Sequence, residues 1–224
     1  MSVFNTAFFS ALPEARVLET GSKYARLDLS EVFTEKNSVE VSNSEAFSKY
    51  VDGIIADLDV DYLWGGYLER RAIYKRSPVF RDSQTPERTI HLGIDLWCDS
   101  GTPVLAALEG EVHSFQNNDS MGDYGPTIIL KHQFAGQVFH TLYGHLSVNS
   151  LQGLWKGKQV KAGEKIGELG DRTVNGDYPP HLHFQIILDM QGKEGDYPGV
   201  SSEEELPDLS ANCPNPNLLL RLTD

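Results

Sequence analysis

Hydrophobic side chains recur with a helical period in one segment of the first third of the chain. The repeating positions i, i+4, i+7 and i+11 are occupied by Phe47, Val51, Ile54 and Leu58. This spacing places them on one face of a helix. Ser42 and Glu45 precede the run with the S-x-x-E spacing of a capping box, which marks a helix start. The pattern predicts a packing helix over residues 42–58.

After this helix the pattern is typical of strands. Residues 62–74 are rich in aromatic and β-branched side chains around Gly65 and Gly66, which predicts a strand or hairpin whose aromatics lie in the core or a groove wall. From residue 90 onward, short hydrophobic runs alternate with Gly, Asp and Pro turns. These runs cover 103–107, 110–115, 126–131, 137–143, 167–170 and 181–188. Regular short strands with such turns predict a mainly β fold built on an antiparallel sheet.

The same patterns divide the chain into three predicted parts. Residues 1–84 form an N-terminal α/β arm, residues 85–190 form a β domain, and residues 191–224 form an acidic C-terminal tail that packs on the domain. A chain of 224 residues is long enough to bury a substantial core.

Charge and composition narrow the range of partners and compartments. The formal net charge is −13, which argues against nucleic acid or an anionic membrane as a partner, because both require clustered Lys and Arg. No run approaches the eighteen or so apolar residues that cross a bilayer. Residues 1–12 lack the basic start and long apolar run of a signal peptide, so a cytoplasmic location is expected, with export left open. Cys98 and Cys213 are expected to be separate thiols, with a single disulfide bridge left open if the protein is exported.

Two histidine motifs about ninety residues apart carry the candidate chemistry: His91-Leu-Gly-Ile-Asp95 and His181-Leu-His183. Residues two apart on a strand share a face, so His181 and His183 point the same way. In a straight strand His91 and Asp95 would lie roughly 13 Å apart, so the chain must bend between them, and Gly93 permits the bend. Two imidazoles and one carboxylate are a minimal ligand set for a catalytic zinc ion.

A further histidine is expected to join these residues. His145 and His140 are separated by an odd number of residues, so a regular strand points only one of them at the site. We select His145, because Gly144 gives the backbone freedom at a sheet end. His140, His113 and His132 are expected to be surface or packed side chains. The absence of an HExxH helix means that a histidine, rather than a glutamate, must act as general base.

Together these motifs resemble the lysostaphin-type zinc metallopeptidases, a family of peptidoglycan endopeptidases with the duplicated hybrid motif. The resemblance covers residues 88–188 and rests on five blocks in the family's order. They are His91-Leu-Gly-Ile-Asp95, Gly101-Thr-Pro-Val104, Tyr143-Gly-His-Leu146, Val160-Lys-Ala-Gly-Glu-Lys-Ile-Gly167 and His181-Leu-His-Phe-Gln185. The resemblance implies a twisted antiparallel sheet with a narrow groove.

Matched position by position, the resemblance also implies the roles of five residues. His91, Asp95 and His183 correspond to the ligands of one Zn2+ ion, and His145 and His181 correspond to two catalytic histidines. The implied reaction is hydrolysis of a peptide bond between small residues such as glycine or alanine, by attack of metal-bound water. The expected substrate is a peptide or a peptidoglycan fragment.

The chain departs from the family pattern at two points. The last block ends in Gln185 where the family has Glu, so an outer hydrogen bond to a ligand would come from an amide. The arm is more similar to metallopeptidase-like modules beside cytoplasmic enzymes, which leaves open an association with another enzyme module. Some family members are held latent by a segment over the metal, and Asn37 or Asn43 of the arm could supply such a contact.

Two alternatives to a competent enzyme exist. The first is a non-catalytic metal-binding or regulatory module on the same fold; the complete set of His and Asp residues favours the enzyme. The second is a lipoyl- or biotin-type carrier, suggested by the Val160–Gly167 hairpin. It is disfavoured because neither Lys161 nor Lys165 sits in a recognisable modification sequence.

Overall fold

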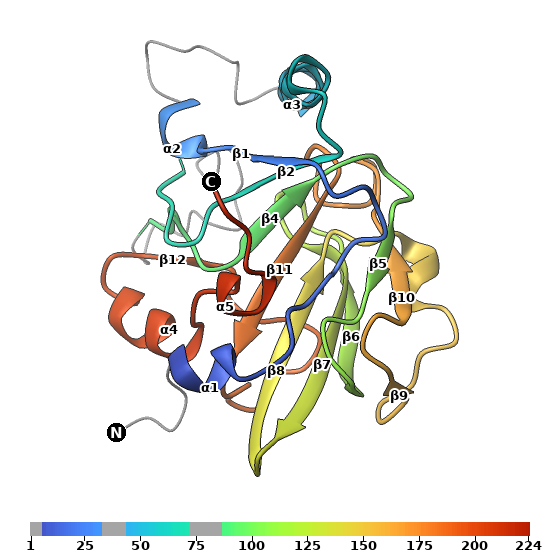
Figure 1. Ribbon diagram of the computed structural model, residues 1–224, viewed down its shortest axis with the longest axis vertical. Coiled ribbons are helices and arrows are strands. Elements are labelled where there is room, and N and C mark those ends of the chain that lie inside the picture. Colours follow the sequence, from blue (N-terminus) through green and yellow to red (C-terminus); the bar gives the residue numbers. More distant parts are fainter. Residues whose placement is uncertain (1–5, 33–43, 72–86) are drawn as a thin grey trace.

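The computed structural model describes residues 6–32, 44–71 and 87–224, and it has a mainly β fold with few helices (Figure 1). The helices are α1 Thr6–Ser10, α2 Leu29–Val32, α3 Ser44–Leu58, α4 Leu206–Asn212, α5 Asn217–Leu220 and a 3-10 turn at Val148–Leu151. The strands before residue 120 are β1 Tyr24–Arg26, β2 Tyr62–Gly65, β3 Ile90–His91, β4 Ile94–Trp97, β5 Pro103–Leu105 and β6 Gly110–Asn118. The later strands are β7 Gly125–Phe134, β8 Gln137–Gly144, β9 Gln159–Val160, β10 Lys165–Glu168, β11 His181–Ile187 and β12 Val200–Ser201. The predicted mainly β class is confirmed.

One large sheet organises the described residues. Its strand order is β1-β2-β4-β11-β8-β7-β6-β9, and two small sheets pair β10 with β5 and β12 with β3. The pairs are antiparallel, as predicted, except for β1 and β2, which run parallel and make the sheet mixed. Because β1 and β2 come from the predicted arm, the sheet crosses the proposed boundary at residues 84/85, and that boundary stays a prediction.

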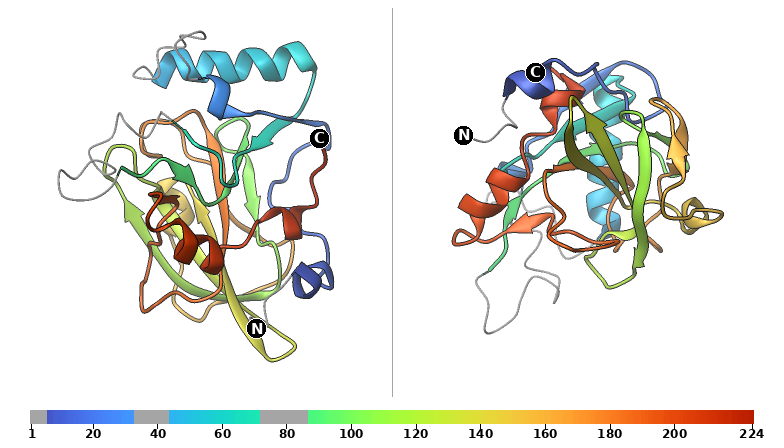
Figure 2. Two further views of the ribbon diagram at one scale, coloured as in Figure 1. Left: turned by 90° about the vertical axis from the view of Figure 1, so that its left-hand side faces the viewer. Right: turned by 90° about the horizontal axis from the view of Figure 1, so that it is seen from below.

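The arm helix α3 begins at Ser44 and ends at Leu58, in agreement with the predicted helix, while Ser42 of the predicted capping box lies outside the described residues. Phe47 and Val51 are buried, whereas Leu58 at the far end is exposed. Figures 1 and 2 show α3 lying across one end of the sheet, close to β1 and β2. The apolar face of α3 therefore packs onto the end of the sheet that carries the site described below.

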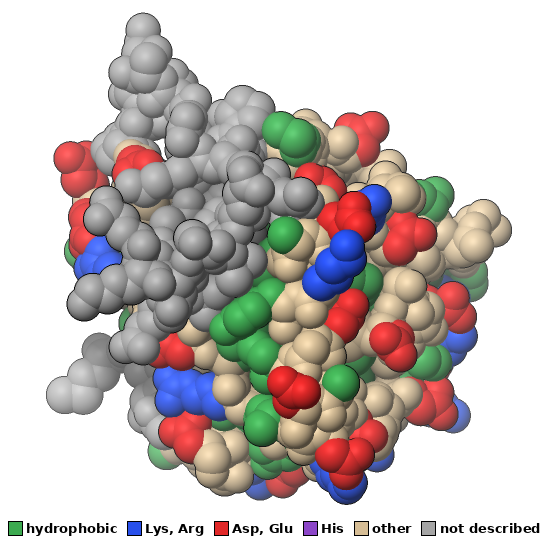
Figure 3. Space-filling view, turned by 90° about the horizontal axis from the view of Figure 1, so that it is seen from above, with side chains coloured by type: hydrophobic (Ala, Val, Ile, Leu, Met, Phe, Trp, Pro, Cys, Tyr) green, Lys and Arg blue, Asp and Glu red, His purple; other side chains and the backbone are tan. Residues whose placement is uncertain are grey.

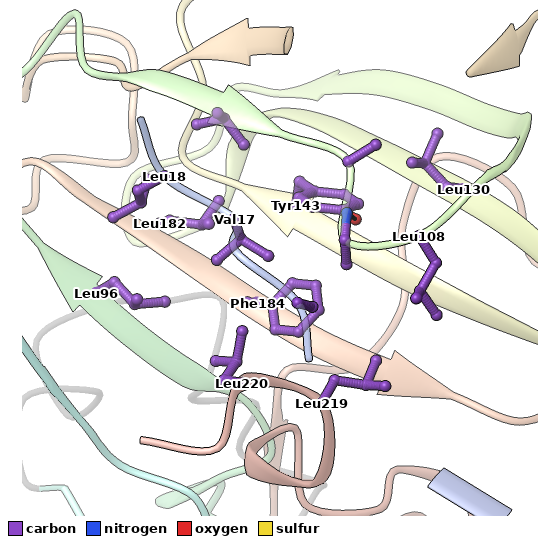
Figure 4. Packing of buried hydrophobic residues seen from close by; sticks show 14 of the residues in the cluster. Val17, Leu18, Leu96, Leu108, Leu130, Tyr143, Leu182, Phe184, Leu219 and Leu220 are labelled. Carbon is purple, nitrogen blue, oxygen red and sulfur yellow. Dashed lines mark hydrogen bonds between the residues drawn. The ribbon is translucent and has the colours of Figure 1, made fainter. Parts of the chain in front are cut away.

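The main hydrophobic core lies on one face of β4 and β11. Leu182 and Phe184 of β11 are fully buried there together with Leu96 of β4. Segments from both ends of the chain cover this face, and Figure 4 shows Val17, Leu18, Leu219 and Leu220 packed over the two strands. Burying a large aliphatic or aromatic side chain contributes roughly 1.5–3 kcal/mol. This core holds β4 and β11 in register and leaves their other face for polar side chains.

Residues of the C-terminal tail pack against strands β8 and β11. Cys213 and Tyr197 are fully buried in a cluster with Leu142 of β8 and Ile187 of β11. Cys98 and Cys213 are both free thiols, as predicted.

On the face seen from above, acidic and basic side chains of the described residues are interspersed (Figure 3). Within the described ranges, no helix combines the length and apolarity needed to traverse a bilayer.

A buried histidine far from the predicted site should make the fold sensitive to acid. The His132 side chain is completely buried, and its Nδ1 donates a hydrogen bond to the Glu109 carbonyl oxygen. Burial lowers the pKa of His132 from 6.5 to about 4. Between these two values the unfolded chain binds a proton that the folded chain does not. Stability from this residue is therefore complete above pH 6.5 and is lost as the pH falls towards 4.

We expect His132→Gln to reduce the difference in free energy of unfolding between pH 7 and pH 5 by about 2 kcal/mol, because the variant has no imidazole to protonate. Urea unfolding of both proteins at the two pH values measures this difference. The control is His113→Gln, which removes a less buried histidine. An unchanged pH dependence in His132→Gln would show that this imidazole is protonated equally in the folded and unfolded states.

Candidate metal centre

Asp95 and His183 face each other on neighbouring strands. β4 and β11 pair in a register that places Asp95 beside His183 and Trp97 beside His181. The two histidines of β11 leave the sheet on the face opposite Leu182. The structure thus places His181 and His183 on one face, as the HxH spacing predicts.

The bend predicted between His91 and Asp95 is present. β3 ends at His91 and β4 begins at Ile94, so the strand is interrupted at Leu92 and Gly93. Gly93 has no positive φ, and its role is to leave space: a Cβ atom there would lie 2.5 Å from Cε1 of His183. The glycine is thus required by the close approach of an imidazole, a reason that differs from the backbone freedom expected from the sequence.

The bend brings three donor atoms together in the buried site. Nε2 of His91 lies 2.9 Å from Nδ1 of His183, and both nitrogens approach Oδ1 of Asp95, at 3.3 and 3.2 Å. Atoms about 2 Å from a tetrahedral zinc ion lie roughly 3.3 Å from one another. The spacing of these three atoms therefore fits one small divalent cation between them.

The outer nitrogens of both imidazoles are held by hydrogen bonds. Nδ1 of His91 donates to the carbonyl oxygen of Gly66 at 2.9 Å, and Nε2 of His183 donates to Oε1 of Gln185 at 2.8 Å. The amide orientation of Gln185 follows from its other contacts, because its Nε2 donates to the Pro198 carbonyl and to Sγ of Cys213. With these protons directed outward, the facing nitrogens present lone pairs, which is the form that binds a metal ion.

Asp95 divides its two oxygens between different partners. Oδ2 accepts a hydrogen bond from Nη1 of Arg71, whereas Oδ1 is buried and accepts no hydrogen bond from the described residues. Burial acts to raise the pKa of Asp95, but His91 and Arg71 outweigh it and hold that pKa well below 3.8. The carboxylate is therefore anionic, and its Oδ1 faces the lone pairs of one nitrogen of His91 and one of His183. A set of donor atoms of this kind fits a cation.

His145 and His181 form a second pair beside the three donor residues. Their ring centroids lie 4.1 Å apart, and both side chains are buried. Nδ1 of His145 donates to the Asn175 carbonyl at 2.8 Å, and Nδ1 of His181 donates to the Pro179 carbonyl at 2.7 Å. Burial lowers the pKa of each imidazole below 6.5. Each histidine is thus neutral, with Nε2 as a proton acceptor.

The backbone explains why His145 rather than His140 reaches the site. β8 ends at Gly144, and His145 adopts a left-handed conformation with φ of 63°, which turns its side chain out of the strand alternation. His140 lies within β8, where its ring contacts His113 with centroids 4.9 Å apart. His132 is packed in the interior. The structure thus places His113, His132 and His140 away from the site, as the sequence predicts.

A cavity of about 240 Å3 adjoins these five residues. Its apolar wall contains Trp97 and Tyr178 of the β domain and Leu29 and Phe47 of the arm. Charged residues of both signs also line it, and they include Arg88, Asp123, Lys193 and Asp196. The cavity is therefore shaped by the arm and the C-terminal tail as well as by the motifs.

Sequence reasoning missed several residues of the site. Arg71, which contacts Asp95, comes from the arm, and Tyr124 lies with its hydroxyl 3.5 Å from Nε2 of His183. The available sequence signal for Arg71 was the charged run Glu69-Arg70-Arg71, and charged runs of this kind are usually exposed to solvent. Tyr124 has no distinguishing pattern. Asn37 and Asn43, named as candidate latency residues, lie outside the described residues.

The comparison with known families bears on the segment that holds all five predicted residues. The model of Peptidase family M23 matches residues 89–196. This segment is a peptidase family M23 domain. The family resemblance inferred from the five motif blocks is thereby confirmed. Arg71 and the rest of the arm precede the matched segment.

Two relatives match this chain over similar lengths. An uncharacterised metalloprotease of Haemophilus influenzae is 33% identical over 98 residues, which are 44% of this chain and 18% of that protein. The peptidoglycan DD-endopeptidase ShyC of Vibrio cholerae is 32% identical over 99 residues, or 44% of this chain and 20% of that protein. The chain therefore spans a fifth or less of the length of these relatives.

Solved structures with a likeness to the chain include two peptidases. The catalytic domain of the antimicrobial peptidase lysostaphin from Staphylococcus simulans aligns with a TM-score of 0.44 and 23% identity, covering 73% of this chain and 97% of that one. A zinc-containing peptidase from Vibrio cholerae aligns with a TM-score of 0.36 and 29% identity, covering 44% and 27%.

Proposed function

We propose that this chain is a zinc metallopeptidase that hydrolyses a peptide bond between small residues, of the kind found in peptidoglycan cross-links. The observation that carries the proposal is the convergence of Nε2 of His91, Oδ1 of Asp95 and Nδ1 of His183, three buried atoms that lie 2.9–3.3 Å from one another. Two imidazoles and a carboxylate are a recurring protein ligand set of catalytic zinc, whose fourth position is kept for water or substrate.

Zinc bound by these three residues would lower the pKa of a water ligand towards about 7 and polarise the scissile carbonyl. His145 and His181 would then handle the protons. The Nε2 atom of each is a bare acceptor, because Nδ1 is held by a backbone carbonyl. One Nε2 takes the proton from the attacking water. Once protonated, it can donate to the developing oxyanion or to the leaving amine.

The substrate part of the proposal rests on the M23 domain and on its named relative. ShyC is a peptidoglycan DD-endopeptidase, and this chain is 32% identical to it over 99 residues. The cavity offers Trp97 and Tyr178 as a wall against an extended peptide and charged residues of both signs for the polar groups of such a substrate. The cytoplasmic location and the association with another enzyme module stay predictions.

Hydrolysis can be tested with the full chain loaded with one equivalent of zinc. We expect it to release new amino termini from purified peptidoglycan or from cross-linked peptide fragments, detected by mass spectrometry. A chelator such as 1,10-phenanthroline should abolish the release, and added zinc should restore it. Zinc-loaded, folded protein that cleaves neither D-alanyl nor glycyl cross-links would contradict the proposal and favour a metal-binding regulatory module.

A further inference from the structure

Arg71 is a buried arginine whose guanidinium lies between two carboxylates. Its side chain is 3% exposed, and its partners Glu69 and Asp95 are 8% and 3% exposed. Nε of Arg71 donates to Oε2 of Glu69, Nη1 donates to Oδ2 of Asp95, and the guanidinium lies 5.6 Å from the ring centroid of Trp97. A buried charge with these contacts is fixed in position rather than free to exchange with solvent.

Backbone hydrogen bonds hold the segment that carries Arg71 against the metal-binding strand. The amide of Leu68 donates to the His91 carbonyl, and the amide of His91 donates back to the Glu69 carbonyl. The amide of Arg71 donates to the carbonyl of Thr89. At the outer end, Oε1 of Glu69 accepts the amide proton of Leu29, where α2 begins. Arg71 is therefore positioned by the arm on one side and by the M23 domain on the other.

These contacts determine which oxygen of Asp95 can reach a metal ion. Because Arg71 holds Oδ2, only Oδ1 faces the nitrogens of His91 and His183. A carboxylate without such a partner can turn and offer both oxygens to one ion. A planar guanidinium, unlike an ammonium group, also fixes the direction of the carboxylate that it binds.

We propose that Arg71 is a positioning residue that makes Asp95 a ligand through one oxygen and thereby keeps the zinc four-coordinate. The inference rests on the proposed function only in that zinc is the ion bound at this site. It means that Glu69 and Arg71, which lie before the matched M23 segment, complete the metal centre. Gly66 belongs to the same contact, because a Cβ atom there would collide with Arg71 and with Nδ1 of His91.

The ion pair between Glu69 and Arg71 permits a test that separates the orientation of the Asp95 carboxylate from the net charge near the metal ion. Glu69 and Arg71 have opposite charges, so Glu69→Gln with Arg71→Met leaves the net charge beside the ion unchanged. We expect this double variant to bind Zn2+ and Co2+ ten- to a hundred-fold more weakly, the usual loss when an outer partner of a ligand is removed. The visible spectrum of bound Co2+ should also change from the intense four-coordinate form to the weaker five-coordinate form. A general loss of packing would not produce that spectral change.

The matched control is Arg70→Met with Glu203→Gln. It removes an adjacent ion pair that is about 60% exposed, with side chains at 58% and 63%, and it should leave affinity and spectrum unchanged. Arg71→Lys serves if the double variant does not fold, because it keeps the charge and loses the planar fork. We expect it to show the same change of cobalt spectrum. Metal affinity within twofold of the native protein and an unaltered spectrum in a folded variant would overturn the proposal. Native protein that binds neither ion would instead contradict the proposed function.

Discussion

Replacing Asp95 with asparagine is expected to leave the purified protein without zinc and to reduce peptide hydrolysis by roughly a thousandfold or more. The substitution keeps the size of the side chain but removes the one anionic donor among the three that converge in the site. Several kilocalories per mole of transition-state stabilisation depend on the metal, and about 4 kcal/mol corresponds to a thousandfold in rate. Zinc content by mass spectrometry and kcat/KM on a cross-linked peptide measure the two effects.

The control for Asp95→Asn is Asp123→Asn, which removes another aspartate that lines the same cavity but lies outside the donor cluster. It should retain one zinc ion per chain. If Asp95→Asn also retained a full equivalent of zinc and its turnover, the carboxylate would not be a ligand and the proposed centre would be wrong.

His145→Ala and His181→Ala should each reduce turnover by about a hundredfold to ten-thousandfold while keeping zinc bound. This is the range over which a positioned general acid or base contributes to a reaction. We expect activity to fall while zinc stays bound, because the cluster of converging donor atoms consists of His91, Asp95 and His183. Neither His145 nor His181 belongs to it. Metal content and kcat should be measured on the same preparations.

A suitable control is His113→Ala, which removes a histidine of β6 that contacts His140 and not the site. Its zinc content and kcat should equal those of the native protein. Full activity in zinc-loaded His145→Ala would remove this residue from the mechanism, and loss of zinc from the same variant would make it a ligand instead.

Part of this arrangement can be read from the sequence because it depends on local geometry. The HxH spacing fixes the faces of His181 and His183, since side chains on any strand alternate with period two. The bend between His91 and Asp95 is required by distance alone. The choice of His145 over His140 also follows from local chain geometry, although its positive φ becomes visible only in the structure.

The rest depends on contacts between segments that are distant in the chain. Gly93 is needed because the ring of His183 approaches it across the sheet, a packing contact that no pattern around residue 93 reveals. The sequence predicts that Gln185 faces the ligands, but it does not explain why this residue is an amide. In the structure, Nε2 of Gln185 donates hydrogen bonds to the Pro198 carbonyl and to Sγ of Cys213. A glutamate in this position would have no proton to donate to that carbonyl.

The contribution of the arm to the site is the main feature of the structure that the sequence does not predict. Leu29 and Phe47 belong to segments predicted only to pack, yet both line the cavity. Arg71 bonds to a residue 24 positions away whose approach depends on the pairing of β2 with β4. Local propensity contains no information about such pairing, because register between distant strands is set by the whole core.

Diffraction from crystals of the zinc-loaded protein, collected on both sides of the zinc absorption edge, tests the central claim most directly. The account predicts one anomalous peak about 2.0–2.2 Å from Nε2 of His91, Oδ1 of Asp95 and Nδ1 of His183. A peak bound by other residues, or no peak while these three side chains keep the arrangement described, would contradict it.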